Sequence, residues 1–365
     1  MSEIPRHMAA VQLLGHGGFD KLRYSGTVPV PEPQDGEVLI RVSAAGVNNT
    51  DINTRIGWYA PEAGQSTAEA LHSGAEPERG DWSGSGLQFP RIQGADVCGF
   101  VVKVGKRVDA ARLGERVIVQ SCLRSLAKGN FIPWLGSERD GAFAQFVSAP
   151  AADTYSVKCE LSDAELAAIP CAFGTAENLL SRAKLAAGET ILIAGASGNV
   201  GLAAIQLAKR RGARVVAIAA AQKFAVLESI GSDRCVERGA DLVASLGPNS
   251  IDVVIDVVGG PRWPQLVEVL EIGGRYAVSG AIAGPLVELD LRKLYLKDLT
   301  LFGCTSQDPE VFPNLISYLE RGEIHPLVSR EYALRDIAAA QEDFLSKRHV
   351  GKIILVPPVL QQEHG

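Results

Sequence analysis

The segment that most constrains the fold is residues 190–212, TILIAGASGNVGLAAIQLAKRRG. Its first part, 191–194, is a short apolar run typical of a strand that is buried on both faces. From 200 to 211 apolar residues recur at helical spacing, and Gly212 fits a C-terminal stop. The turn between them is punctuated by Gly195, Gly198 and Gly201. Strand, glycine turn and helix in this order predict a site where the backbone approaches a pyrophosphate at a helix N-terminus.

The turn departs from the usual dinucleotide fingerprint because Ala196 stands at the first glycine position. A glycine pattern alone is weak evidence, since other tight turns between a strand and a helix look similar. The alternation that follows is stronger, with strands predicted at 214–219, 251–257 and 275–279 and a helix at 222–230. It indicates a parallel sheet wrapped by helices. We therefore expect cofactor contacts at Ala196, Ser197, Gly198, Asn199, Val200 and Gly201.

The N-terminal half of the chain is predicted to be a β domain. Near-alternating apolar residues bounded by proline and glycine predict strands at 8–14, 38–44, 97–104, 116–119 and 143–148. Residues 162–186 are expected to be helical, beginning at a capping box of Ser162 and Glu165. Two later helices are predicted at 308–321 and 334–347, and a closing strand at 351–356. The fold class is therefore α/β plus β, and 365 residues allow two domains.

Composition narrows the class of protein. Hydrophobic residues make up 46% and charged residues 21%, and the net charge is −6. Without a basic tract, nucleic acid is not an expected partner. The first seven residues, MSEIPRH, lack the apolar core of a signal peptide, and no stretch is long enough to span a bilayer. The six cysteines form no Cys-x-x-Cys pair, which favours a reducing compartment. We expect a cytoplasmic protein that binds a small-molecule substrate and no membrane.

Residues 55–90 form an irregular stretch rich in Gly, Ser, Ala, Glu and Pro, and they hold Trp58, Tyr59 and Trp82. The stretch is too long and too polar for a tight turn. One interpretation is a surface excursion, and the other is a lid over an active site, since long irregular loops in compact domains are usually functional or disordered. The sequence leaves both open.

Five stretches carry a family resemblance. They are residues 31–51 (PEPQDGEVLIRVSAAGVNNTD), 94–99 (GADVCG), 188–209, 256–260 (DVVGG) and 350–355 (VGKIIL). In combination the chain resembles the medium-chain dehydrogenase/reductase superfamily, and within it the zinc-free quinone oxidoreductase-like branch. The resemblance implies a GroES-like β-barrel catalytic domain at 1–157, to which 304–365 return. It implies a Rossmann cofactor domain, a doubly wound parallel sheet, at 158–303.

Compared with zinc-dependent members of the same superfamily, this chain lacks two of the residues that bind the metal. Zinc-dependent relatives place a Cys ligand where this chain has Asn48, and a His ligand where it has Ala95. Their third ligand falls near Cys171, which is retained. One thiolate with no His partner is not a catalytic zinc site, which needs three protein ligands. Asp96 could bind a cation in principle, and Cys171 is better explained as a small core residue. We expect no metal.

The choice of nicotinamide rests on the end of the second predicted strand. An NAD enzyme places Asp or Glu there to bind the ribose hydroxyls. This chain has Ala219, Ala220 and Ala221 instead, and Lys223 lies close enough to pair with a 2′-phosphate. A solvated helix lysine is the alternative for Lys223. The missing acid favours NADP(H).

Further contacts are implied by the resemblance alone. Thr175 corresponds to a threonine near the nicotinamide ring. Later strand ends carry Val258, Ser279 and Gly280, where the ring and its amide are usually held. Residues 299–304 resemble the last Rossmann strand, whose edge pairs with its twin across a two-fold axis, so a homodimer is expected.

Three residues are candidates for catalysis. Asn48 takes the place of the lost ligand and is the first candidate for a hydrogen-bond donor to substrate; its alternative is a loop amide that caps local backbone. Tyr59 resembles a tyrosine at the cleft mouth of quinone oxidoreductases, where it could donate a hydrogen bond or a proton. A half-exposed packing tyrosine is the alternative. Asp51 is expected to orient the loop.

These features predict an NADPH-dependent, zinc-free oxidoreductase that transfers hydride to a quinone or to the C=C bond of an α,β-unsaturated carbonyl. Without zinc the protein lacks a strong Lewis acid, and hydrogen-bond donors would stabilise the developing enolate. A zinc-independent, NADP-linked carbonyl or alcohol dehydrogenase is one alternative. A nucleotide-bound sensor with little turnover is another.

Overall fold

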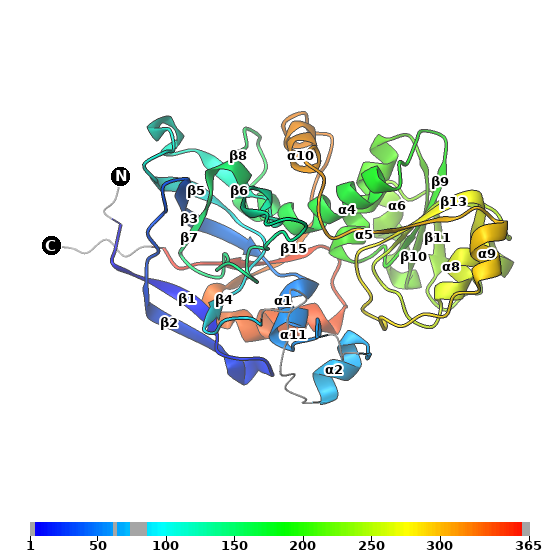
Figure 1. The fold of residues 1–365 in the computed structure, drawn as a ribbon, viewed down its shortest axis with the longest axis horizontal. Helices are drawn as coiled ribbons and strands as arrows, with labels where there is room; N and C mark the ends of the chain where they lie inside the picture. Colours follow the sequence, from blue (N-terminus) through cyan, green and yellow to red (C-terminus); the bar gives the residue numbers. More distant parts are fainter. Residues whose placement is uncertain (1–3, 61–63, 74–85, 360–365) are drawn as a thin grey trace. The chain divides into compact units, whose positions relative to one another are not determined.

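The protein is described by a computed structural model that covers residues 4–60, 64–73 and 86–359 (Figure 1). The chain divides into two compact units. Unit 1 comprises residues 1–60, 75–171 and 326–365, and unit 2 comprises 61–74 and 172–325. Two of the divisions fall at 171/172 and 325/326, where the family resemblance implied 157/158 and 303/304. The difference arises because residues 158–171 and 326–359 group with unit 1, while 304–325 group with unit 2.

Unit 1 is built on β3, which pairs with β5, β7 and β16. The larger sheet runs in the order β15-β16-β3-β5-β6-β8, with β7 on β3, and a smaller sheet runs β2-β1-β4. All pairings are antiparallel except β15 with β16. The strands are β1 His7–Leu13, β2 Leu22–Pro29, β3 Glu37–Gly46, β4 Arg91–Ile92, β5 Cys98–Val104, β6 Arg116–Val119, β7 Phe146–Pro150, β8 Thr154–Ser156, β15 Val328–Ala333 and β16 Lys352–Val356.

Three α-helices lie wholly in unit 1: α1 Asn49–Arg55, α3 Asp163–Leu166 and α11 Ile337–Ser346. The Ser162 capping box is present, since the Ser162 hydroxyl accepts from the Glu165 N–H. The single helix expected over 162–186 is wrong. Its first turn ends at Leu166, and α4 begins anew at Pro170, where the missing N–H of proline costs a helix nothing.

Unit 2 contains a six-stranded parallel sheet in the order β11-β10-β9-β12-β13-β14. Numbered along the chain this is 3-2-1-4-5-6, the doubly wound dinucleotide-binding order, with its switch point between β9 and β12. The strands are β9 Thr190–Ala194, β10 Arg214–Ala219, β11 Arg234–Glu237, β12 Ile251–Asp256, β13 Leu270–Val278 and β14 Thr300–Gly303. The helices are α2 Thr67–Ser73, α4 Pro170–Arg182, α5 Asn199–Arg210, α6 Phe224–Ser229, α7 Leu242–Leu246, α8 Trp263–Val269, α9 Leu291–Leu296 and α10 Val311–Glu320.

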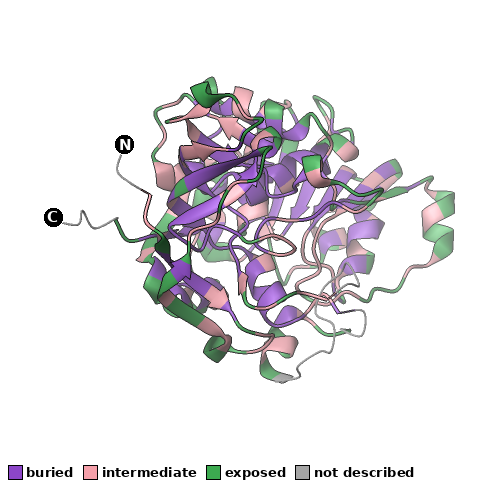
Figure 2. Cartoon of the chain, turned by 60° about the vertical axis from the view of Figure 1, so that its left-hand side comes forward, coloured by how far each residue is buried: buried purple, intermediate pink, exposed green. Residues whose placement is uncertain are grey.

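The mainly antiparallel sheets of unit 1 and the parallel sheet of unit 2 confirm the predicted fold class, a GroES-like domain with a Rossmann domain. The C-terminal strand β16 pairs with β3, so both ends of the chain contribute to unit 1 as expected. The central strand β9 is fully buried at Ile191, Leu192 and Ile193. Figure 2 shows such buried strands in purple. No helix among the described residues is long and apolar enough to cross a membrane.

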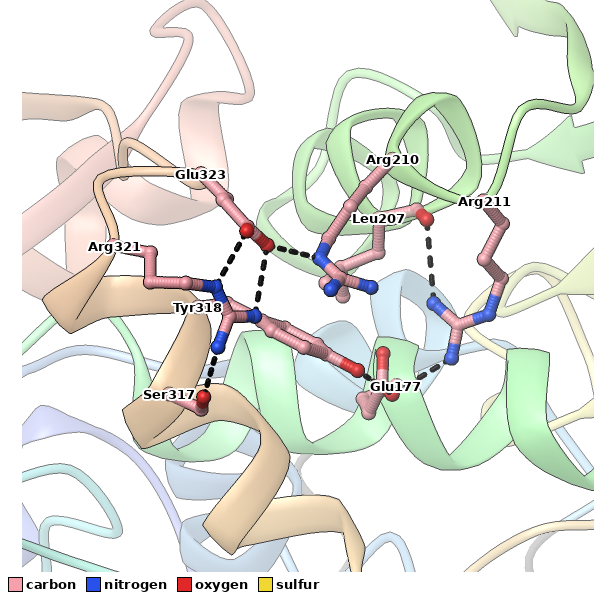
Figure 3. A network of polar contacts seen from close by, with 8 residues as sticks. All are labelled: Glu177, Leu207, Arg210, Arg211, Ser317, Tyr318, Arg321 and Glu323. Carbon is pink, nitrogen blue, oxygen red and sulfur yellow. Dashed lines mark hydrogen bonds and ion pairs between the residues drawn. The ribbon is translucent and has the colours of Figure 1, made fainter.

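Polar contacts tie three helices of unit 2 together (Figure 3). The buried Glu177 on α4 accepts from Arg211, just after α5, at 2.7 Å. The guanidinium of Arg210 lies over the ring of Tyr318 on α10, 3.5 Å from its centroid. Arg210 also pairs with Glu323, which Arg321 holds from the other side. We interpret this cluster as a cross-link that holds α10 against the Rossmann helices.

Candidate active site

The phosphate turn of unit 2 has the predicted shape. Gly195 adopts a φ of +75°, which favours glycine, and Gly198 is the N-cap of α5. A Cβ at Gly201 would lie 2.5 Å from Ala196 Cα, so this glycine lets the helix begin directly against the turn. A Cβ at Gly198 would meet only Gly195 O, at 3.4 Å. The exposed backbone at Gly198, next to the first N–H groups of a helix, fits the approach of a pyrophosphate.

The last residues of β10 include no acid, and the register partner of Ala219 on the neighbouring strand β11 is Glu237. Ala219 ends the strand, and Lys223 is 6% exposed in the turn that follows. Burial and the nearby Arg238 guanidinium both lower the pKa of the Lys223 ammonium. The Arg238 N–H donates to Ala219 O at 2.8 Å, so both cations belong to this strand end. Two like charges held together favour an anionic ligand. Sequence reasoning missed Arg238, because β11 itself was not predicted.

Asp256, at the carboxyl end of β12, shapes the neighbouring turn. Its buried carboxylate accepts from the N–H of Val258 at 2.7 Å and from the Tyr276 hydroxyl at 2.7 Å. Ser279 follows β13, and its N–H donates to Asp256 O at 3.1 Å. Val258, Ser279 and Gly280 therefore lie at neighbouring strand ends. Such ends are where open α/β sheets bind ligands.

Thr175 lies on α4 and is half-buried. The preceding residue is Gly174, where an added Cβ would lie 2.6 Å from Gln307 Nε2, so the Gln307 side chain packs closely against this turn of α4. The role of Thr175 at a nicotinamide stays a prediction.

In unit 1 a buried polar cluster surrounds Asn48, the N-cap of α1. Lys352 Nζ lies 2.5 Å from Asp96 Oδ2 and 2.6 Å from Asn48 Oδ1. Asn48 Nδ2 donates to Asp96 Oδ2 at 2.8 Å and, over a longer 3.4 Å, to Gly46 O. The Cys171 N–H donates to Asp96 Oδ1 at 2.6 Å. Asn48, Asp96 and Lys352 are each at most 4% exposed.

Asp51 and Tyr59 lie beside this cluster. Asp51 accepts the Asn48 N–H at 2.7 Å, and burial raises the pKa of its carboxyl to about 7. Tyr59 is half-buried, and its hydroxyl donates to Thr50 Oγ1 at 3.3 Å. Burial also raises the pKa of the Tyr59 phenol, so it stays protonated at neutral pH. The structure thus brings the three catalytic candidates into one region of unit 1.

Lys352 is the residue of this cluster that sequence reasoning missed. It begins β16, whose other residues are apolar. A lone charged residue in an otherwise apolar strand is a usable signal, because a buried ammonium requires a partner. The identity of that partner is a tertiary contact and cannot be obtained from the local pattern.

The irregular 55–90 segment is only partly described. It contains α2, whose Thr67 N–H donates to Ile282 O at 3.1 Å within unit 2. Trp58 and Tyr59 pack edge to face, with ring centroids 5.5 Å apart. Residues 61–63 and 74–85, and with them Trp82, lie outside the described residues. Whether the segment is a lid stays a hypothesis.

Comparisons with known proteins agree with both units. A family model described as an alcohol dehydrogenase GroES-like domain matches residues 34–159, and one described as a zinc-binding dehydrogenase matches 199–321. The chain is 28% identical over 363 residues to a quinone oxidoreductase of Rattus norvegicus, covering 96% of this chain and 98% of that protein. It is 29% identical to an acryloyl-coenzyme A reductase of Metallosphaera sedula, covering 95% and 99%.

A solved structure from Sinorhizobium meliloti 1021 has the same fold, with a TM-score of 0.89 and 44% identity over 98% of this chain and 99% of that one. The fold, the phosphate turn and these similarities define an oxidoreductase with a Rossmann domain. The chain belongs to the medium-chain dehydrogenase/reductase superfamily, in its quinone oxidoreductase-like branch. Oxidoreductases of this family use a nicotinamide cofactor.

The zinc named in one family description does not fit the residues of this chain. Ala95 offers no donor atom, and Asn48 and Asp96 are already bound to an ammonium. Among the described residues no group of three or more His, Cys, Asp or Glu side chains is arranged to hold a metal ion.

Proposed function

We propose that this protein is an NADPH-dependent reductase that transfers hydride, without a metal ion, to the C=C bond of a small α,β-unsaturated carbonyl or to a quinone. The observation that carries the proposal is the Asn48–Asp96–Lys352 cluster, whose polar groups satisfy one another where zinc relatives place ligands. Such a site offers hydrogen bonds and a protonated phenol rather than a Lewis acid. Hydrogen-bond donors of this kind stabilise the negative charge that builds on the carbonyl oxygen when a conjugated double bond is reduced.

The unit 2 residues supply the cofactor site in this proposal. Bound NADPH would provide the hydride. The first turn of α5 receives the pyrophosphate at the exposed backbone of Gly198. Lys223 and Arg238 favour the 2′-phosphate, since β10 itself ends in Ala219 rather than in an acidic residue. These charges are the basis for preferring NADPH over NADH.

The unit 1 residues act on the acceptor. Asn48 has one amide hydrogen firmly bound to Asp96 and the other in a long contact with Gly46 O, so the second is the one offered to the substrate carbonyl oxygen. Tyr59 holds its phenol proton at neutral pH and serves as the proton donor. Asp51 holds the Asn48 backbone in place. Negative charge that builds on the substrate oxygen is thereby met by hydrogen bonds.

We also propose a homodimer formed through β14, which is the outer strand of the unit 2 sheet. The strand exposes Leu301, and the segment before it exposes further large apolar side chains: Leu286, Val287, Leu291, Tyr295 and Leu296. An edge strand with an apolar surround is suited to pair with its own copy. We also propose that the protein is cytoplasmic, as its cysteine usage leads us to expect.

The deciding experiment follows NADPH consumption by chelator-treated protein with an α,β-unsaturated ketone and identifies the product by mass. A saturated ketone supports metal-free reduction of the double bond. An allylic alcohol contradicts it and favours carbonyl reduction. If neither the enone nor an ortho-quinone consumes NADPH, the proposed activity is wrong.

A further inference from the structure

The side chain of Lys352 ends where a cation would be coordinated. Its Nζ is 2.5 Å from Asp96 Oδ2 and 2.6 Å from Asn48 Oδ1, one carboxylate and one amide oxygen. Among hard metal ions in proteins, Ca²⁺ binds oxygens of these two kinds at about 2.3–2.6 Å. The ammonium therefore occupies the position and makes the contacts of a coordinated cation.

The surroundings leave no place for a second ion. A Cβ on Gly46 would lie 2.6 Å from Asp96 Oδ2 and 2.7 Å from Ala167 O, so the cluster is packed directly against backbone. The remaining carboxylate oxygen, Asp96 Oδ1, accepts the Cys171 N–H at 2.6 Å. Any metal ion approaching these oxygens would also meet the charge of Lys352 at close range.

The orientation of the Asn48 amide follows from the same charges. Its oxygen faces the ammonium and its nitrogen faces the carboxylate. The opposite orientation would place N–H groups against the ammonium and an oxygen against the carboxylate. Asn48 is thus held as a ligand of the lysine, with its oxygen unavailable to a metal.

We propose that the Lys352 ammonium is the resident cation of this site and excludes a divalent metal ion from the oxygens of Asn48 and Asp96. Neutralising Lys352 opens a cation site there. The inference deepens the metal-free function proposed above and rests on it for treating this cluster as part of the reacting site. The binding itself is independent of turnover.

The test measures Co²⁺ binding by equilibrium dialysis of folded wild type, Lys352→Arg, Lys352→Met and the double variant Lys352→Met/Asp96→Asn. Lys352→Met leaves Asp96 with a buried, unpaired charge, whereas Lys352→Arg keeps the cation. We expect Lys352→Met to bind one equivalent of Co²⁺ at least tenfold more tightly than wild type and Lys352→Arg. The double variant lacks the Asp96 carboxylate, so the Co²⁺ that it binds measures binding elsewhere on the protein, at cysteines and histidines. This amount is subtracted as the blank.

Two results would overturn the proposal: wild type that binds a Co²⁺ equivalent absent from the blank, or Lys352→Met with no gain over wild type. If Lys352→Met does not fold, Lys352→Gln takes its place under the same criterion, because its amide keeps a donor to Asp96. No substrate enters this assay. If wild type excludes Co²⁺ but does not reduce enones, only the proposed function is refuted. If wild type reduces enones but binds Co²⁺ at this cluster, only the metal exclusion is refuted.

Discussion

Lys352 Nζ lies 2.6 Å from Asn48 Oδ1, although the two residues are 304 positions apart in the chain. The contact places the first residue of the last strand against the N-cap of the first α-helix. Asn48 in turn holds Asp51 through its backbone N–H. The C-terminal strand thus fixes the residues that we propose to act on the substrate.

Replacing Asn48 tests its proposed role as a donor. Asn48→Ala removes the amide hydrogen offered to the substrate oxygen, and loss of one such donor typically costs about 10²-fold or more in kcat. We expect kcat for enone reduction to fall by about that factor. The Kd for NADPH should be unchanged, since the proposed phosphate contacts lie in unit 2. Stopped-flow kinetics and fluorescence titration measure both. An unaltered kcat would assign Asn48 a packing role only.

Asp51 predicts a pH dependence of stability. Burial raises the pKa of its carboxyl from 3.8 to about 7 in the folded state. The folded state therefore binds more protons than the unfolded state between these values, and this group's contribution to stability is lost as pH rises from about 4 to about 7. The full effect is on the order of 4 kcal/mol.

The measurement is urea unfolding of wild type and Asp51→Asn from pH 4.5 to pH 8. The asparagine keeps an acceptor for the Asn48 N–H but cannot ionise. We expect the free energy of unfolding of wild type, taken relative to Asp51→Asn, to decrease over this range. Titrating groups that do not interact with Asp51 cancel in that difference. A flat difference would show that the Asp51 pKa is not raised.

The elements that could be predicted from the sequence are those whose structure is determined by residues close to one another in the chain. The strand at 214–219 and the helix at 200–211 agree with β10 and α5 to within a residue, because their apolar periodicity is local. The prediction of one helix over 162–186 was wrong because a new helix, α4, begins at Pro170.

The residues of the candidate site also divide into those that the local sequence predicts and those that it does not. The phosphate turn around Gly198 could be located from spacing alone. Lys352 and Arg238 could not, because their importance comes from Asp96 and Ala219, which reach them only through sheet pairing and burial. Long-range polar contacts leave no periodic signal in a sequence.

Cofactor choice tests the basic end of β10. Lys223→Ser and Arg238→Ser each remove a charge that we propose to bind the 2′-phosphate. We expect KM for NADPH to rise by about 10- to 100-fold in each, in line with an ionic hydrogen bond of roughly 1.5–3 kcal/mol, while KM for NADH changes little. Arg234→Ser is the matched control, since Arg234 is exposed at the opposite end of β11. Equal losses for both cofactors would contradict the proposal.

The dimer proposal rests on the edge strand β14. Leu301→Lys places a charge on the strand expected to pair with its copy, so we expect light scattering to show a monomer where wild type is a dimer. Val226→Lys is the control, because Val226 is equally exposed, at 37% against 38%, but lies on α6. Wild type that is monomeric at micromolar concentration would refute the interface directly.

Two glycines of the phosphate turn should respond differently to the same change. At Gly198 an added Cβ meets only Gly195 O at 3.4 Å, so Gly198→Ala should fold normally yet obstruct the close approach of a pyrophosphate. We expect its NADPH affinity to fall at least tenfold with little change in Tm.

At Gly201 the added Cβ lies 2.5 Å from Ala196 Cα, so Gly201→Ala should lose about 1–3 kcal/mol of stability from overpacking. Gly239→Ala, where nothing lies within 4 Å, controls for the methyl group itself. Calorimetry and fluorescence titration separate the two effects. NADPH affinity retained in Gly198→Ala would mean that the cofactor does not contact this turn.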